Sequence, residues 1–359
     1  MRLKLISVLL LTVSMASFHH PAPAAPKIPS ECLASGSGIN KKIPTSFEEL
    51  ILKRKCISYA AWKNVSSSTS ASSSKPTIEV LIGPNTKPFY LNPVVAVQAI
   101  NSTFSNSIYT GDSLYIYFNF KDSAWAKRTV QSLLTADEYE NISRNQGDRV
   151  IENGCDAVSK SCFGSQAITL VTGKGLVLLG VPNSLNKNDP TASYRFKTGM
   201  LEAHEHLHLL QDAALFGEVH GAQIWPPRWI TEGGAEYIQN AVIHKNSWRK
   251  YRDYRFLGAS ELYRLKSTYS EKFLIEYLQE TVIDDGGSKY DSWLSYNLGS
   301  RFVEILVALK GPNSLLELNS EIGMGMNFAQ AFEKVYGISW NKAVPILAKV
   351  VSSDIAQRS

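Results

Sequence analysis

The chain has 359 residues, of which 44% are hydrophobic and 19% are charged. This composition excludes a disordered or fibrous protein and supplies enough apolar side chains for one large domain or two smaller ones. The formal net charge of +5 is too small to indicate a nucleic-acid or membrane-surface partner.

Residues 1–24 have the layout of a secretory signal peptide. Two basic residues precede a largely apolar run over residues 5–18, and Ala-Pro-Ala at residues 22–24 offers a cleavage site. The run is too short to cross a bilayer, so we expect no stable membrane insertion. The mature protein is therefore expected to be secreted, to the extracellular space or the periplasm.

The segment 25–65 is predicted to be mostly helical and to contain a disulfide. The four cysteines form two locally spaced pairs, which favours Cys32 with Cys56 and Cys155 with Cys162 in an oxidising compartment. Three pairings are formally possible. A four-cysteine zinc site is the less favoured alternative, because no C-x-x-C spacing occurs. A serine-rich stretch, residues 66–76, then indicates a linker.

Residues 77–359 are predicted to form the main domain, with an α+β fold. Strand-like and helix-like runs alternate over residues 77–181, which indicates a mixed sheet with helices packed on it. After residue 194 the pattern is helical almost throughout. We therefore expect an α/β lobe over residues 77–215 and a helical lobe over residues 216–359.

The sequence HEHLH begins at His204 and matches H-E-x-x-H. Good helix formers flank it, so we predict a helix over about residues 198–215. His204 and His208 then lie one turn apart on the same face, where two imidazoles can hold one zinc ion. Glu205 is rotated by about 100° and can reach a water on that metal. His206 points away from this face and is expected not to be a ligand.

A third ligand is expected from the next predicted helix, RWITEGGAEYIQNAV. Its first turn carries Glu232, and a carboxylate from a second helix can complete a His, His, Glu site. Glu236, one turn further on, is expected to accept the free ring N–H of His204 or His208. Each assignment also has a structural alternative. For His204 and His208 it is a chance histidine pair, for Glu232 a first-turn acid favoured by the helix dipole, and for Glu236 a surface acid.

These motifs resemble those of the gluzincin metallopeptidases, the thermolysin and aminopeptidase-N superfamily. HEHLH followed by WITEGGAEY matches their usual order, and SYNLGSRFVEIL is similar to a helix start that supplies a tyrosine hydroxyl in aminopeptidase-like members. The end of the chain is similar to the helical tail of bacterial peptidase-MA-like proteins. The resemblance covers about residues 165–345. The usual G-x-M-E-N and N-E-x-x-S-D signatures are absent.

The resemblance implies a thermolysin-like fold, zinc held by His204, His208 and Glu232, Glu205 as the general base, and Tyr296 as the oxyanion donor. Outside this setting, Tyr296 is a packing tyrosine. The expected function is a secreted zinc metallopeptidase acting on a peptide or protein substrate. The alternatives are an inactive zinc-binding module for extracellular binding and a zinc hydrolase of a non-peptide bond. We expect the strand GLVLLGV to be the sheet edge that pairs with substrate. Nothing in the sequence indicates an oligomeric state.

Overall fold

The computed structural model describes eleven stretches of the chain. The predicted signal peptide and most of the serine-rich stretch lie outside them. The described residues are 28, 32–33, 43–68, 77–109, 111–140, 151, 154–170, 172–186, 188–216, 225–282 and 289–356.

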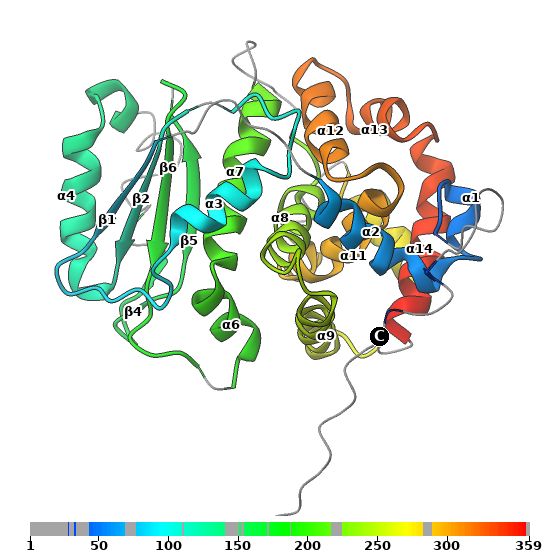
Figure 1. Ribbon diagram of the computed structural model, residues 1–359, viewed down its shortest axis with the longest axis horizontal. Helices are drawn as coiled ribbons and strands as arrows, with labels where there is room; N and C mark the ends of the chain where they lie inside the picture. The colour runs from blue at the N-terminus through cyan, green and yellow to red at the C-terminus, as the bar shows by residue number, and fades with distance from the viewer. Residues whose placement is uncertain are drawn as a thin grey trace, which may run out of the picture.

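A mixed four-stranded sheet forms the first lobe, with the order β1-β2-β6-β5 (Figure 1). The strands β1 (Ile78–Ile82), β2 (Ser113–Phe118) and β6 (Gly175–Gly180) are parallel, and β5 (Ser165–Thr169) runs antiparallel to β6. The expectation that GLVLLGV forms the sheet edge is therefore wrong. Its apolar run reflects a central strand buried on both faces, and the edge strands of this sheet are β1 and β5.

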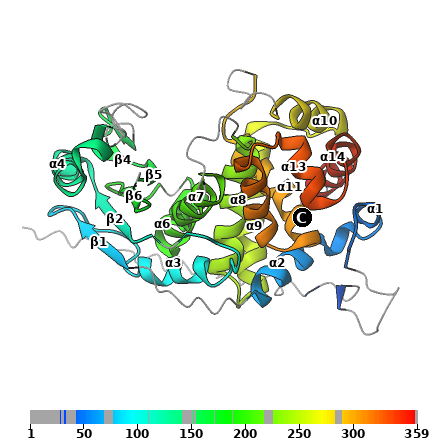
Figure 2. The ribbon, with the colours of Figure 1, turned by 90° about the horizontal axis from the view of Figure 1, so that it is seen from above.

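Helices cover both faces of this sheet (Figures 1 and 2). The helix α4 (Ser123–Leu133), which follows η3 (Phe120–Asp122), packs on one face, and α3 (Pro93–Asn101) and α7 (Met200–Phe216) lie on the other. Side chains of β2 and β6 alternate between these two layers because successive residues of a strand point to opposite faces. The lobe thus has a helix-sheet-helix architecture.

The second lobe is helical, as the sequence predicts. Its largest helix pair is α8 against α11, and α12 packs on α7. Among the described residues, no helix combines the length and apolar character needed to cross a membrane. The helices are α8 (Arg228–Ile243), α9 (Trp248–Leu265), α10 (Glu271–Glu280), α11 (Leu294–Lys310), α12 (Asn313–Gly323), α13 (Phe328–Tyr336) and α14 (Trp340–Ala356).

The amino-terminal segment packs into the helical lobe. It contains α1 (Phe47–Leu50), η2 (Arg54–Cys56) and α2 (Ile57–Ser67), and α2 lies against α11. Asn64 Nδ2 of α2 donates to the carbonyls of Val307 and Ala308, at 2.8 and 3.1 Å. The segment is thus part of the same hydrophobic core as the helical lobe.

Both predicted disulfides are confirmed. Cys32 bonds to Cys56, and Cys155 bonds to Cys162 across the short hairpin of β3 (Cys155–Asp156) and β4 (Ser161–Cys162). The described chain has no free cysteine. Two disulfides are typical of proteins from an oxidising compartment, as secreted proteins are.

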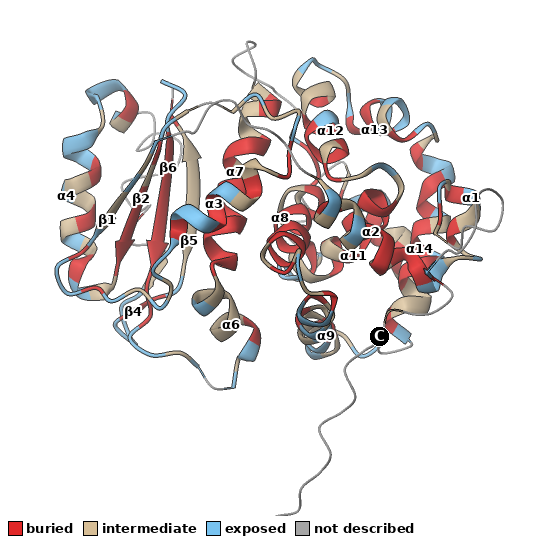
Figure 3. Cartoon of the chain, viewed as in Figure 1, coloured by how far each residue is buried: buried red, intermediate tan, exposed pale blue. Residues whose placement is uncertain are grey.

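The helix α7 lies between the two lobes and is buried along most of its length (Figures 2 and 3). Leu209 packs toward the sheet, whereas Leu207 and Leu210 belong to the helical core. The preceding helix is α6 (Pro190–Thr198), and it is capped by Gly199. This glycine has a left-handed backbone with a φ of 83°, which ends α6 before α7 begins. A helix with apolar side chains all around is a buried helix, so the HEHLH sequence enters the interior of the protein. The described chain is therefore a mixed α and β protein, and its likeness to thermolysin stays a prediction.

Candidate metal centre

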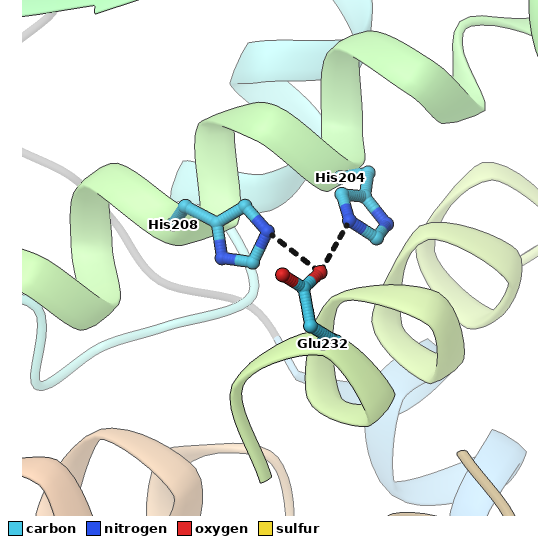
Figure 4. A group of neighbouring side chains, drawn as sticks. All are labelled: His204, His208 and Glu232. Atoms are coloured by element: carbon cyan, nitrogen blue, oxygen red, sulfur yellow. Dashed lines mark hydrogen bonds and ion pairs between the residues drawn. The ribbon is translucent and has the colours of Figure 1, made fainter. Parts of the chain in front are cut away.

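His204 and His208 of α7 converge with Glu232 of α8 (Figure 4). Glu232 Oε2 lies 3.4 Å from His204 Nε2 and 3.4 Å from His208 Nε2. One ligand atom from each of the three residues lies within 4.8 Å of the other two. These are the three residues that the sequence predicts as metal ligands.

The separations fit a metal ion. Donors about 2.0–2.2 Å from a tetrahedral zinc ion are about 3.4 Å apart, which is the spacing of the carboxylate oxygen from each imidazole nitrogen. The donor set of two imidazoles and one carboxylate also suits other divalent transition metals. The group can therefore hold a metal ion, and the geometry by itself does not select the element.

Helical pitch explains why the histidines meet. Residues four apart lie on one face of α7, and the two rings are in contact with centroids 4.9 Å apart. The helix that carries Glu232, α8, begins at Arg228, directly after Pro226 and Pro227. Proline is common at the start of a helix because no backbone N–H is needed there. Glu232 is thus the fifth residue of α8 and belongs to its second turn, not to its first as the sequence predicts.

The charges of the three groups are strongly coupled. Burial opposes ionisation of His208, but the negative charge of Glu232 outweighs this effect and raises the pKa of His208 to about 9. Burial lowers the pKa of His204 to about 3. Burial would raise the pKa of Glu232, but the charge of His208 and hydrogen bonds from both imidazoles hold it well below its usual range. The carboxylate therefore stays ionised, as a metal ligand must be.

Two glycines set the contact between α8 and α11. A Cβ atom on Gly233 would lie 2.4 Å from the carbonyl carbon of Gly299, and one on Gly299 would lie 2.7 Å from the Trp229 carbonyl oxygen. No side chain fits at such distances, so the two backbones touch. Gly233 follows Glu232 directly, and Gly299 lies one turn after Tyr296. The glycines in the two motifs therefore bring the carboxylate and the tyrosine together.

Tyr296 lies beside the histidines. Its ring stacks on the His204 ring at a centroid distance of 5.9 Å and an interplanar angle of 13°. The Arg228 guanidinium lies 5.7 Å from the centre of the tyrosine ring. Burial and the nearby charge of Glu232 raise the pKa of Tyr296, so its hydroxyl keeps its proton and can donate a hydrogen bond.

Glu205 is buried and contacts a residue that the sequence did not single out. Ser165 Oγ donates to Glu205 Oε1 at 2.6 Å. Burial raises the pKa of Glu205. Ser165 is the first residue of the edge strand β5, and no local motif links it to α7 because the contact depends on how the helix lies across the sheet.

The prediction that Glu236 accepts a hydrogen bond from the ring of His204 or His208 is wrong. Glu236 Oε2 lies 4.0 Å from His204 Nδ1, which is too long, and that nitrogen has no hydrogen-bond partner among the described residues. Glu236 instead accepts from Gln239 at 2.5 Å and from Tyr254 at 3.1 Å. These donors hold the carboxylate, and its Oε2 stays beyond hydrogen-bonding distance of the imidazole.

Gln211 makes the hydrogen bond that the sequence assigns to Glu236. Its side-chain oxygen lies 2.7 Å from His208 Nδ1, and its amide nitrogen donates to the Thr231 carbonyl at 3.1 Å. Such a contact fixes which ring nitrogen of the histidine faces the metal. The signal was present in the sequence, since Gln211 lies three residues after His208 on the same helix.

The remaining polar residues of α7 lie outside the ligand group. His206 contacts Tyr115 Oη at 2.9 Å and Asn101 Oδ1 at 2.8 Å, so it points away from the ligand group as expected, toward the sheet side. Asp212 accepts from Thr169 Oγ1 at 3.1 Å. His220, a further histidine between His208 and Glu232 in the sequence, lies outside the described residues.

Comparisons of the chain with models of protein families, with curated proteins and with solved structures found no match. The assignment of a metal centre therefore depends on the residues and distances given above.

Proposed function

We propose that the protein is a secreted zinc-dependent metallopeptidase that hydrolyses peptide bonds. One observation carries the proposal: Glu232 Oε2 lies 3.4 Å from Nε2 of both His204 and His208, while Glu205 follows His204 directly in the same helix. Three protein donors and an adjacent carboxylate that does not belong to the ligand group are the minimum for metal-assisted hydrolysis.

Two imidazoles and one carboxylate favour zinc among the metals used for hydrolysis. When bound to these three residues, a zinc ion would polarise the scissile carbonyl and lower the pKa of water at its open position. The two disulfides support the secreted location, because they are typical of chains from an oxidising compartment.

Glu205 takes the proton of the attacking water and passes it to the leaving amine. Ser165 donates to one oxygen of this carboxylate, so it fixes the orientation of the group and leaves the second oxygen for the reacting water. Tyr296, with its hydroxyl protonated, donates to the oxygen of the scissile carbonyl as negative charge develops on it. The glycine contact of α8 with α11 holds this tyrosine in place.

The edge strand β5 offers a backbone surface for an extended substrate. It pairs with β6 on one side, and the sheet of the described residues has no strand on its other side. Its first residue, Ser165, contacts Glu205, so a peptide added along β5 would run past the proposed general base.

The test compares the wild type with the Glu205→Gln variant. We expect one zinc per chain in both proteins by elemental analysis, because Glu205 is not a ligand. We expect cleavage of a mixed peptide library, read by mass spectrometry, by the wild type alone, and loss of that cleavage in a chelator. The general base contributes about 10²–10⁴-fold to such reactions.

Each other outcome has a defined meaning. A carefully prepared wild type without any bound metal would falsify the proposal. Metal binding without cleavage of any peptide would favour the inactive zinc-binding module, and cleavage of ester substrates alone would favour a hydrolase of a non-peptide bond. Equal peptide cleavage by both proteins would remove Glu205 from the mechanism.

A further inference from the structure

A second cluster of charged side chains surrounds a cavity of about 200 Å³ in the helical lobe. The cavity lies where the amino-terminal segment meets α9, α11 and α14, and its lining comes from all of these elements. None of the three metal ligands lines it. We call it the arginine cavity.

The lining of the arginine cavity is strongly cationic. Five basic side chains and two acidic ones, Glu304 and Asp354, give the lining a net charge of +3. Two of the basic residues come from the amino-terminal segment and three from the helical lobe. The basic residues are Arg54, Lys55, Arg252, Arg255 and Arg301.

The two acids are bound mainly to one arginine. Arg255 Nη2 lies 2.7 Å from Glu304 Oε2 and 2.8 Å from Asp354 Oδ2. Arg255 also donates from Nε to both oxygens of Glu304, at 2.9 and 3.1 Å. Both acids therefore pair most closely with Arg255, and the lining keeps its net positive charge.

Arg301 is the most buried of the five basic residues. It is buried, with 4% of its surface exposed, and its Nη1 has no hydrogen-bond partner among the described residues. Its Nη2 donates to the Arg255 carbonyl at 2.7 Å, and its Nη1 lies 3.8 Å from Asp354 Oδ2, which is too long for a hydrogen bond. Burial and the charge of Arg255 lower the pKa of Arg301. A buried guanidinium with an unused donor is costly unless an acceptor reaches it.

We propose that the arginine cavity binds a small oxyanion, a phosphate or a carboxylate, held by Arg301 at its inner end and by Lys55 and Arg252 nearer the surface. Guanidinium groups donate to such anions with fixed, forked geometry. A volume of about 200 Å³ is below the range of drug-sized ligands, so the cavity suits a group of a few heavy atoms. The anion would join the amino-terminal segment to the helical lobe. The inference does not rest on the proposed peptidase function.

Calorimetric titration of the full chain with inorganic phosphate tests the proposal, at constant ionic strength maintained with sodium chloride. We expect saturable binding of one phosphate per chain. Because Lys55 is exposed and Arg252 only partly buried, Lys55→Gln and Arg252→Gln should fold normally and weaken phosphate binding about tenfold each. Lys63→Gln is the matched control, since Lys63 is an exposed lysine of α2 outside the cavity lining.

A parallel titration with acetate identifies the type of anion. Tighter binding of phosphate assigns the cavity to phosphate groups, and tighter binding of acetate assigns it to carboxylates; both results support the proposal if the two cavity variants weaken them. The proposal is overturned if neither anion binds saturably. It is also overturned if Lys63→Gln weakens binding as much as the cavity variants do, or if the cavity variants bind as the wild type does.

Discussion

The metal centre and the arginine cavity are two clusters of buried charge that share one helix. Tyr296, near the start of α11, lies beside the metal ligands, whereas Arg301 and Glu304 line the cavity further along the same helix. In the metal centre, two imidazole nitrogens and one carboxylate oxygen converge within 4.8 Å of one another. In the cavity, positive groups surround a volume of about 200 Å³.

The difference follows from the size and charge of what each cluster can hold. A metal ion needs several nitrogen and oxygen donors about 2 Å from one point, which two helices can supply. An oxyanion is larger and needs donors around its surface, and the basic side chains of the cavity come from three elements, η2, α9 and α11. The helix α11 thus contributes to the compact ligand group near its start and to the wider cavity with a basic lining further along.

The largest expected effect is on zinc binding, and it tests whether the metal centre and the arginine cavity are independent. Glu232→Gln removes the anionic ligand and should weaken zinc binding about 10³-fold, because each of three ligands carries roughly a third of a binding free energy of about 12 kcal/mol. Phosphate binding in the arginine cavity should remain within twofold of the wild type. Competition with a chromophoric chelator measures the first and calorimetry the second. Equal loss of both would mean that the clusters are not independent.

The contact between α8 and α11 supports the metal centre, and it can be tested with glycine substitutions. Gly233→Ala should lower the free energy of unfolding by about 3 kcal/mol, because the new methyl group meets the backbone of Gly299. The control is Gly258→Ala in α9, where the added atom meets only Asn297 Oδ1 at 3.6 Å. That variant should be neutral or up to about 1 kcal/mol more stable, from helix propensity. Urea unfolding measures both, and similar losses in the two would contradict the backbone contact.

Removing only the hydroxyl of Tyr296 tests its proposed role as the hydrogen-bond donor to the oxyanion. Tyr296→Phe should lower kcat about a hundredfold with KM and zinc content unchanged, since the donor acts on charge that develops in the transition state. The control is Tyr269→Phe, which removes the hydrogen bond from Tyr269 to the Leu262 carbonyl in the helical lobe. That variant should lose about 1 kcal/mol of stability and keep its kcat. Unchanged kcat in Tyr296→Phe would make Tyr296 a packing residue.

The smallest effect is expected at the edge strand. Ser165→Ala removes the hydrogen bond to Glu205 and should lower kcat/KM about tenfold, the loss typical of one hydrogen bond to a charged group. Ser165→Thr keeps the hydroxyl and should restore most of the activity. Steady-state kinetics on a single cleaved peptide measures both variants. If Ser165→Thr is as impaired as Ser165→Ala, the effect of the residue is steric.

Local sequence was enough for the features that depend on one helix or on neighbouring cysteines. The pair His204 and His208 follows from helical pitch, and the two disulfides follow from short separations along the chain. The structure also brings Glu232 beside the two histidines, as the sequence predicts from the next helix along the chain. The expected edge strand was wrong, since a central parallel strand and a short apolar edge look alike in a single sequence.

The tertiary structure alone decided which distant residues surround these groups. Ser165 reaches Glu205 only because α7 crosses β5, and the arginine cavity exists only because α2 packs on α11. The sequence by itself determined two helices whose side chains can bind a metal ion. The packing of the helices and the sheet decided the contacts of Glu236, Gln211 and Arg301, because the sequence periodicity shows which face of an element is buried but does not show what the face packs against.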